Sequence, residues 1–399
     1  MPKSNLVVGN IGLIKSLNKR NILNAIVRKG SISRTEIARR VRLAMPSVMR
    51  IVDDFVKDGI VIETGKGDST GGRKPSMLSI NPGARFFLGS TVLDEIKSIV
   101  TNTDGQILGS AKTKTGLNGG EDEIIIQLKA NMDMAIAASG LAPKDIAYAG
   151  IGTPGMGFTY MDRPGSGAFA FWSKLSKETF KRRCQFEFPA VVENIAKVGA
   201  LGELRYGNGK EQPDYLFIEV GLGVGMGVVR GGRLDIGVDG LAGEFGHTSI
   251  NFAGSECYCG KRGCVESYCS VGALLQEYQR RRVIDGTPCE RNPSMEDFAE
   301  AIEKEDPTAL DVAVSCGQLL GLGISNAVNL YNPGAVIVGG DACGIPLYVE
   351  SAFEAARKGI FMNTSRSVKL FIASQEKPTY LMGAVAIAIE HFFDEYCRG

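Results

Sequence analysis

Hydrophobic residues in the first 80 positions recur with helical and then strand-like spacing. Between residues 10 and 29 the apolar positions lie about one helical turn apart, and Gly30 follows as a typical helix stop. Ser33 is placed to cap a second, short helix over 34–40, and a third helix is predicted over 45–58. Two short helices joined by a turn of roughly three to four residues form a helix-turn-helix.

Two strand-like runs follow this unit, at 59–63 and 75–80. The segment between them, 65–74, is basic and rich in glycine, which is typical of the tip of a β-hairpin wing. We therefore expect residues 1–82 to form a winged helix-turn-helix domain. The second helix of a helix-turn-helix enters the major groove of DNA, and its N-terminal residues face the base edges. In this chain that helix is the third predicted one, over 45–58.

Five residues are candidates for contacting DNA. Ser47, Met49 and Arg50 lie in the first turns of the third predicted helix. Arg50 can pair with a guanine, and Ser47 can serve a base or a phosphate. Arg73 and Lys74 in the wing are expected to reach a phosphate or a minor groove. The alternative is a helical protein–protein module whose cations are only solvated.

Net charge separates this N-terminal segment from the rest of the chain. The 399 residues have a formal net charge of +1, but residues 1–80 carry 15 Lys and Arg against 6 Asp and Glu. The remaining residues carry 30 against 38. A basic end on an acidic protein is typical of a module that binds a polyanion. The charge distribution therefore favours double-stranded DNA as a partner.

Beyond residue 82 strand-like and helical runs alternate, which predicts an α/β fold. The strand-like runs are 86–92, 96–101, 146–150, 190–192, 215–220, 225–229 and 335–338. The helical runs are 121–139, 174–183, 195–203, 294–304, 308–331 and 380–396. A chain of this length is too long for one ordinary core, so we expect two or three domains.

One segment, 243–266, combines a histidine with clustered cysteines. His247 is one of two histidines, and Cys257, Cys259 and Cys264 are three of nine cysteines. One imidazole and three thiolates complete the four-ligand set of a structural zinc site. The alternative, scattered free thiols, does not explain three cysteines within eight residues. We therefore predict one Zn²⁺ per chain, held by these four residues.

Composition also bears on the compartment. No apolar run reaches the ~18 residues that span a bilayer, and the N-terminus lacks a signal-peptide pattern. An odd number of cysteines, partly clustered, fits a reducing compartment and a metal site better than a disulfide framework. We expect a cytoplasmic protein without a membrane partner.

The zinc segment carries a family resemblance as well. Gly-Glu-Phe-Gly-His at 243–247, followed by Cys-Tyr-Cys-Gly-Lys-Arg-Gly-Cys-Val-Glu at 257–266, resembles the signature of the ROK family of bacterial sugar kinases and sugar-responsive repressors. Further pieces that resemble the family are 151–155, 192–194, 221–227 and 337–340. The resemblance implies two actin-like lobes of the ribonuclease H-like, sugar-kinase type. We place the first lobe at 83–197 plus 381–399, and the second, with the zinc loop, at 198–380.

The kinases of this family need a general base that this chain lacks. Their base is the aspartate that follows Val-x-Asn, and here Ile195 occupies that position. Isoleucine accepts no proton, and Glu193 is expected to point away if a strand continues here. In the first phosphate loop, Thr91 and Leu93 replace the family's aspartate and a glycine, and Asp94 and Glu95 are expected to face the phosphates. We therefore predict no catalytic residue and no enzyme activity.

The resemblance implies a sugar site in the cleft between the lobes. Glu244, His247 and Glu266 match positions whose polar atoms reach the sugar, and Asn194 matches another. Trp172 could offer an apolar face to a sugar ring. The other role for the two glutamates is to orient the zinc loop. Three alternatives stay open: a monosaccharide or close relative, another small ligand, or no ligand.

These observations together predict a transcriptional regulator of the ROK type, with repression as the expected sign. Its kinase-derived sensor would bind a sugar or related small effector without phosphorylating it. A homodimer or homotetramer would bind operator DNA. The rival interpretation is an active ATP-dependent sugar kinase with a DNA-binding appendage, and a third is a regulator whose sensor has become a protein-binding scaffold.

Overall fold

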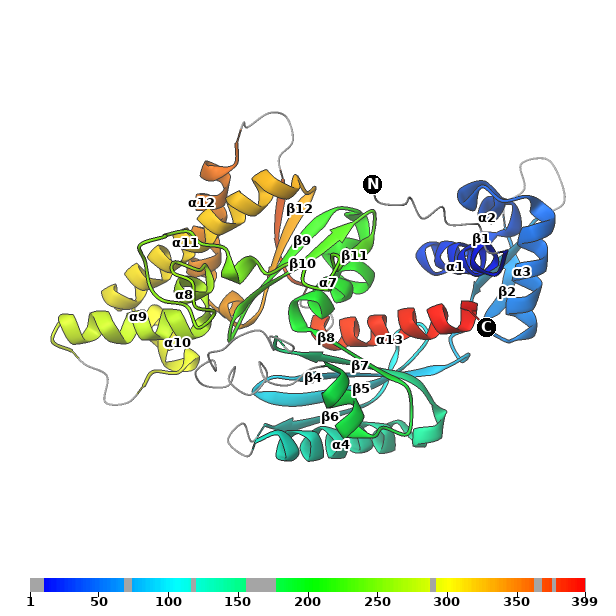
Figure 1. Cartoon of the computed structure of the whole chain (residues 1–399), viewed down its shortest axis with the longest axis horizontal. Helices are drawn as coiled ribbons and strands as arrows, with labels where there is room; N and C mark the ends of the chain where they lie inside the picture. Colours follow the sequence, from blue (N-terminus) through cyan, green and yellow to red (C-terminus); the bar gives the residue numbers. More distant parts are fainter. Residues whose placement is uncertain are drawn as a thin grey trace, which may run out of the picture.

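The computed structural model describes residues 11–67, 74–115, 120–155, 177–287, 292–361, 368–374 and 378–398. These residues form a small N-terminal unit and two larger lobes, each built on its own sheet (Figure 1). The α/β fold with an N-terminal winged helix-turn-helix, predicted from the sequence pattern, is confirmed.

The N-terminal unit packs three helices against a three-stranded antiparallel sheet of order β1-β3-β2. Ser33 caps the second helix as predicted, because its hydroxyl accepts the Glu36 backbone N–H at 3.2 Å. The two-residue strand β1 was not predicted, because two residues are too few to show an alternating pattern. The elements are α1 (Ile11–Lys29), β1 (Ile32–Ser33), α2 (Arg34–Val41), α3 (Met45–Lys57), β2 (Val61–Lys66) and β3 (Ser76–Ile80).

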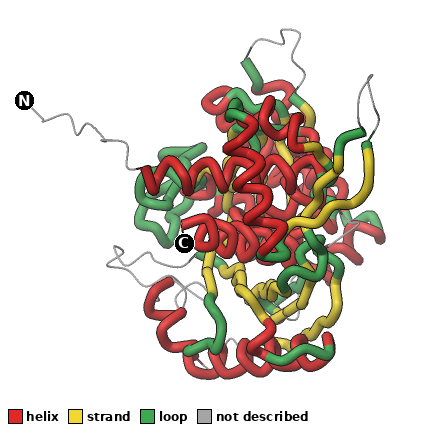
Figure 2. The backbone as a smooth tube through the Cα atoms, turned by 90° about the vertical axis from the view of Figure 1, so that its right-hand side faces the viewer, coloured by secondary structure: helices red, strands yellow, loops and turns green. Residues whose placement is uncertain are grey.

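The first lobe is built on a five-stranded sheet of order β6-β5-β4-β7-β8, in which β4, β7 and β8 run parallel. Helix α4 covers one face of the sheet and α13 the other (Figures 1 and 2). The elements are β4 (Phe86–Val92), β5 (Glu95–Asn102), β6 (Ile107–Lys114), α4 (Gly120–Ser139), η2 (Pro143–Asp145), β7 (Ile146–Thr153), α6 (Lys177–Cys184), β8 (Ala190–Asn194) and α13 (Thr379–Arg398).

The second lobe repeats this plan with a sheet of order β11-β10-β9-β12-β13, in which β9, β12 and β13 run parallel. Helix α7 packs on one face, and the apolar side chains of the other face join a core with α8, α9, α11 and α12. The elements are α7 (Ile195–Tyr206), η3 (Asn208–Glu211), β9 (Tyr215–Val220), β10 (Val224–Arg230), β11 (Arg233–Asp235), η4 (Phe245–His247), α8 (Glu266–Cys269), α9 (Val271–Ile284), α10 (Met295–Glu303), α11 (Pro307–Tyr331), β12 (Ala335–Gly339), η5 (Asp341–Gly344), α12 (Pro346–Gly359) and β13 (Lys369–Ile372).

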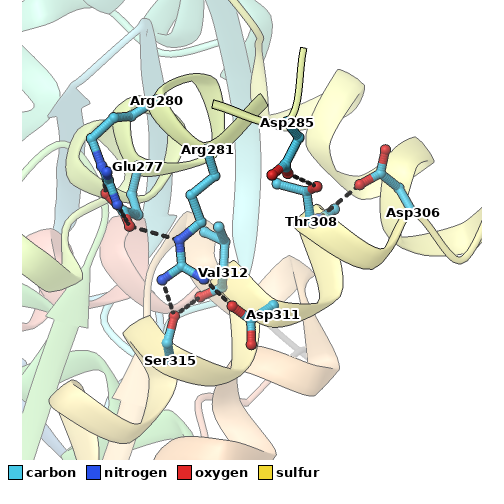
Figure 3. Close-up of polar contacts among 10 residues, drawn as sticks. Glu277, Arg280, Arg281, Asp285, Asp306, Thr308, Asp311, Val312 and Ser315 are labelled. Atoms are coloured by element: carbon cyan, nitrogen blue, oxygen red, sulfur yellow. Dashed lines mark hydrogen bonds and ion pairs between the residues drawn. The ribbon is translucent and has the colours of Figure 1, made fainter. Parts of the chain in front are cut away.

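Helix α11 is the central helix of this second core. It is the one helix in the described ranges long and apolar enough to cross a membrane, yet 56% of its most apolar stretch is buried inside the fold. Its partly exposed side is held to α9 by an ion-pair network (Figure 3). Arg281 donates to Glu277 at 2.7 Å and to Ser315 at 3.0 Å, and it also pairs with Asp311. The apolar character of α11 therefore reflects core packing.

Helix α13 contacts all three units. It packs on β4 and β7 of the first sheet and on α7 of the second lobe, and its last turns reach α1 (Figure 1). The approach to α7 is so close that a Cβ atom on Gly383 would lie 1.8 Å from the carbonyl oxygen of Val198. At its other end, Asp394 pairs with Arg20 of α1 at 2.8 Å, and the Tyr396 ring lies 6.0 Å from that of Phe55 in α3. The winged unit and the first lobe consequently share one hydrophobic core.

Candidate functional site

The four predicted zinc ligands lie together. The ligand atoms of His247, Cys257, Cys259 and Cys264 are all within 4.8 Å of one another. The Cys259 and Cys264 sulfurs are 3.6 Å apart, and the Cys257 sulfur lies 3.7 Å from Nδ1 of His247. A tetrahedron with metal–sulfur bonds of ~2.3 Å has sulfur–sulfur edges of about 3.8 Å, so this spacing suits a zinc ion. Burial lowers the pKa of His247, which favours the neutral imidazole that binds metal.

Backbone turns at two glycines bring the cysteines together. Gly260 and Gly263 both adopt positive φ angles, of 86° and 74°. At Gly263 a side chain is also excluded by space, because a Cβ atom would lie 1.7 Å from the carbonyl oxygen of Asn251. The Cys257 N–H then bonds to the Lys261 carbonyl at 2.8 Å, which closes the loop around the sulfurs. The cluster of ligands is therefore built into the loop backbone.

A cavity adjoins this loop and lies between the strand ends of the two sheets. Its wall includes the ends of β7 and β8 in the first lobe and the β9–β10 turn in the second. Ligands of open α/β sheets commonly bind beyond the carboxyl ends of the strands. The predicted effector residues Asn194, Glu244, His247 and Glu266 all line this cavity. Trp172, and the rest of 156–176, lies outside the described residues.

Hydrogen bonds connect the metal cluster to the cavity. Nε2 of His247, the nitrogen that faces away from Cys257, lies 3.2 Å from the Tyr258 hydroxyl. Tyr258 also bonds to the carboxylate of Glu266, whose Oε2 accepts the Val224 backbone N–H at 2.8 Å. Burial raises the pKa of Glu266. The metal loop is therefore linked through Tyr258 to a carboxylate in the cavity wall.

The structure places an apolar side chain where the kinases of the family have their catalytic aspartate. Ile195 is the first residue of α7, is buried, and lines the cavity. Strand β8 continues past Glu193 to Asn194, and α7 begins directly afterwards with Ile195. Asn194 caps this helix, with its side-chain oxygen accepting the Ala196 N–H at 2.9 Å. The Glu193 carboxylate accepts the Asn194 N–H at 2.8 Å, and Glu193 is not part of the cavity wall.

The two acidic residues after β4 differ in their surroundings. Glu95 forms ion pairs with Lys97 at 3.1 Å and Lys112 at 2.7 Å, so its charge is compensated on the sheet. Asp94 makes no ion pair with a described residue, and its pKa is raised by burial and by the neighbouring charges of Glu95 and Glu296. The sequence predicted that Asp94 and Glu95 would both face the phosphates. Of the two, only Asp94 contributes an uncompensated negative charge. Leu93 lines the cavity, and Thr91 is buried in β4.

Three polar side chains of the cavity wall were not predicted from the sequence. Glu219 is only 7% exposed, and burial together with Asp341 and Glu266 raises its pKa well above the usual range. Lys197 is also buried in the cavity wall and donates to the Gly240 carbonyl. Tyr258 completes the set. The available signal was a glutamate within the otherwise apolar strand Tyr-Leu-Phe-Ile-Glu-Val and a lysine on the apolar helix 195–203.

Four of the five predicted DNA-contacting residues lie in the described part of the winged unit. Met49 and Arg50 are exposed on α3, and Ser47 is half-buried in its first turn. Lys74 is exposed beside the wing, whereas Arg73 lies outside the described residues. Arg34, another cation of this unit, is bound within it by Glu63 and Asp53 at 2.8 and 3.0 Å.

Comparison with known proteins agrees with this geometry. The model of the ROK family matches residues 93–391, and a winged helix-turn-helix DNA-binding model matches residues 16–62. This chain belongs to the ROK family.

Two repressors resemble this chain over most of the length of both proteins. The xylose repressor of Caldicellulosiruptor bescii is 29% identical over 98% of this chain and 100% of that protein. The N-acetylglucosamine repressor of Shigella flexneri is 28% identical over 85% of this chain and 84% of the relative. A solved ROK family transcriptional regulator, described as a homologue of the E. coli MLC protein, has the same fold. It superimposes with a TM-score of 0.76 over 96% of this chain and 98% of its own, at 23% identity.

Proposed function

We propose that this protein is a zinc-containing transcriptional repressor that releases its operator when a monosaccharide binds between the two lobes. The winged helix-turn-helix and the ROK domain identify a DNA-binding transcriptional regulator. The named sugars of its relatives, xylose and N-acetylglucosamine, support a sugar or a related small molecule as effector. A reducing cytoplasm suits a site of three thiolates.

The proposal rests on a physical connection between the metal loop, the cavity and helix α7, which packs on the helix that holds the winged unit. His247 belongs both to the metal cluster and to the cavity wall. Asn194 and Ile195 begin α7 in the same wall, and α7 packs against α13 through the close contact at Gly383. Since α13 also holds the winged unit, a ligand that shifts α7 changes the position of α3. The ligand can bias DNA binding only by its difference in affinity for the two arrangements.

The same cavity is poorly suited to phosphoryl transfer. Ile195 cannot take a proton from a sugar hydroxyl, and Glu193 is held by the backbone outside the cavity. Asp94 adds a negative charge on the side from which a polyphosphate would approach. We infer that the sensor binds its effector without phosphorylating it.

The effector prediction concerns Glu266. In the wild-type protein, D-xylose, D-glucose or N-acetyl-D-glucosamine is expected to release a fluorescent operator duplex, as measured by anisotropy. Glu266→Gln should raise the sugar concentration needed about 10- to 100-fold, because hydrogen bonds to a charged group contribute ~1.5–3 kcal/mol. Operator affinity without sugar should stay within about twofold.

Glu256→Gln is the matched control, since Glu256 lies on the same loop but is exposed and pairs with Arg262. It should leave the response to sugar intact. Equal responses in the Glu266→Gln protein and the wild type would contradict the assignment of the cavity. Sugar-dependent release of ADP from ATP by the wild type would instead restore the kinase interpretation.

A second prediction separates base readout from phosphate contacts. Arg50→Ala is expected to relax base preference at one position of each half-site, at a cost of about 1–3 kcal/mol for the preferred base. Lys74→Ala should weaken all sequences alike and reduce the slope of log K against log salt by about one. Titrations of specific and random duplexes at several salt concentrations test both. An unchanged preference in the Arg50→Ala protein would place the reading helix elsewhere.

Two features of the assembly belong to the same proposal. We assign residues 1–82 to DNA binding, 83–197 plus 381–399 to the first lobe and 198–380 to the second. A homodimer, or a homotetramer made from two such dimers, would present two α3 helices to a palindromic operator. Sedimentation of the full chain with and without operator duplex tests this arrangement.

A further inference from the structure

The N-terminal half of helix α3 exposes two large apolar side chains to solvent. Val48, Ile51, Val52 and Phe55 are buried and supply the core contacts of the helix. Met45 and Met49, at the edge of this buried face, are 36% and 48% exposed. Thioether side chains are flexible and polarizable, so they adapt to irregular apolar surfaces. The core is complete without these two methionines, which leaves their side chains available to a partner.

The charges along α3 indicate which part of the helix meets DNA. Arg50 is the cation beside the two methionines, whereas Asp53 and Asp54 are exposed about one turn further on. Asp53 is held by Arg34 at 3.0 Å, which fixes it on the flank of the helix. Carboxylates are repelled by the phosphate backbone, so the C-terminal half of α3 must stay away from it. The half that enters the groove is the one that carries Met45, Met49 and Arg50.

The spacing of the methionines suggests what they touch. They are four residues apart and therefore lie on one face, with about 6 Å of rise between them. Base pairs stack at ~3.4 Å, so the two side chains address positions about two steps apart. In the major groove the apolar feature of a base edge is the C5 methyl group of thymine.

We propose that Met45 and Met49 read thymine methyl groups, so that each operator half-site carries two thymines about two steps apart beside the base pair read by Arg50. This inference rests on the proposed binding of operator DNA through α3, and it adds the chemistry of the recognised bases. Burial of one methyl group favours the complex about fourfold, so two methyl groups contribute about 10- to 20-fold of preference for thymine over uracil.

The test begins with selection of preferred duplexes from random sequence by the full-length, zinc-loaded protein. Thymines in the selected half-site are then replaced one at a time by deoxyuridine, which removes only the methyl group. The wild type is expected to lose about fourfold in affinity at two positions. Met49→Ala should abolish the loss at one of these positions and Met45→Ala at the other, while Met49→Leu, which keeps an apolar side chain, should retain most of it.

Met134→Ala is the matched control, because Met134 is 50% exposed on α4, away from the winged unit. It should behave as wild type, and thermal melting should show that all four variants are folded. Half-sites without thymine, or deoxyuridine duplexes bound as tightly as thymine ones, would overturn the inference while leaving the repressor assignment intact. Failure to select any sequence would contradict the repressor assignment itself. Methionine variants that lose self-association instead of methyl sensitivity would show that a second protein chain covers this face.

Discussion

Replacing Cys259 by alanine is expected to release the zinc and to cost roughly 4 kcal/mol or more of unfolding free energy, the range typical of a lost metal site. Cys259 lies 3.6 Å from Cys264 in the ligand cluster, and three remaining ligands cannot complete a closed tetrahedral site. Because His247 leads through Tyr258 to Glu266, effector binding should be lost as well. Metal content by mass spectrometry, thermal melting and sugar titration measure the three effects.

Cys343→Ala is the control for this experiment. Cys343 is a half-buried cysteine outside the cluster, and its thiol donates to the Val338 carbonyl. Its removal should leave one zinc per chain and the response to sugar unchanged. A Cys259→Ala protein that kept full zinc and wild-type stability would refute the metal assignment.

Replacing Gly383 by valine is expected to separate α13 from α7. A Cβ atom there would lie 1.8 Å from the Val198 carbonyl oxygen, and backbone cannot rotate out of the way as a side chain can. Overpacking usually costs ~1–3 kcal/mol, and a clash with backbone at this distance should exceed about 3 kcal/mol. Operator affinity should fall together with stability, because α13 also holds the winged unit.

Gly272→Val tests whether any valine in a helix has this effect. Gly272 lies in α9, and nothing is within 4 Å of the position that its Cβ atom would occupy. Valine is a better helix former than glycine, so this change should not destabilise the protein and should alter its unfolding free energy by less than about 1 kcal/mol. Denaturant titrations give both free energies. Equal losses in the two variants would show that the contact between α7 and α13 is not tight in solution.

The sequence was most informative where local spacing decides the structure. The three helices of the winged unit, the α/β alternation and the convergence of His247 with three cysteines all follow from short-range patterns. Strand β6 was missed because its alternation is carried by small and polar residues, Gly109, Ser110 and Ala111 among them. Helices α9 and α12 were missed because charged residues interrupt their apolar positions.

The cavity depended on tertiary contacts that no local pattern encodes. Glu219 lies in a strand whose apolar sequence predicts burial. Only the tertiary fold brings it beside Asp341 and Glu266. The role of Asn194 as the N-cap of α7 was likewise hidden, although the strand at 190–192 and the helix at 195–203 on either side of it were predicted. Family resemblance supplied the cavity residues that spacing alone could not.

The docking of the winged unit on α13 has a consequence for protein synthesis. Tyr396 bonds to Asp58, a residue 338 positions earlier in the chain. At about 5–20 residues per second, a ribosome needs roughly 17–70 s to travel between them. During that interval the winged unit has left the ribosome while its partner helix has not yet been made. Each new chain can therefore dock its winged unit on α13 only after this delay.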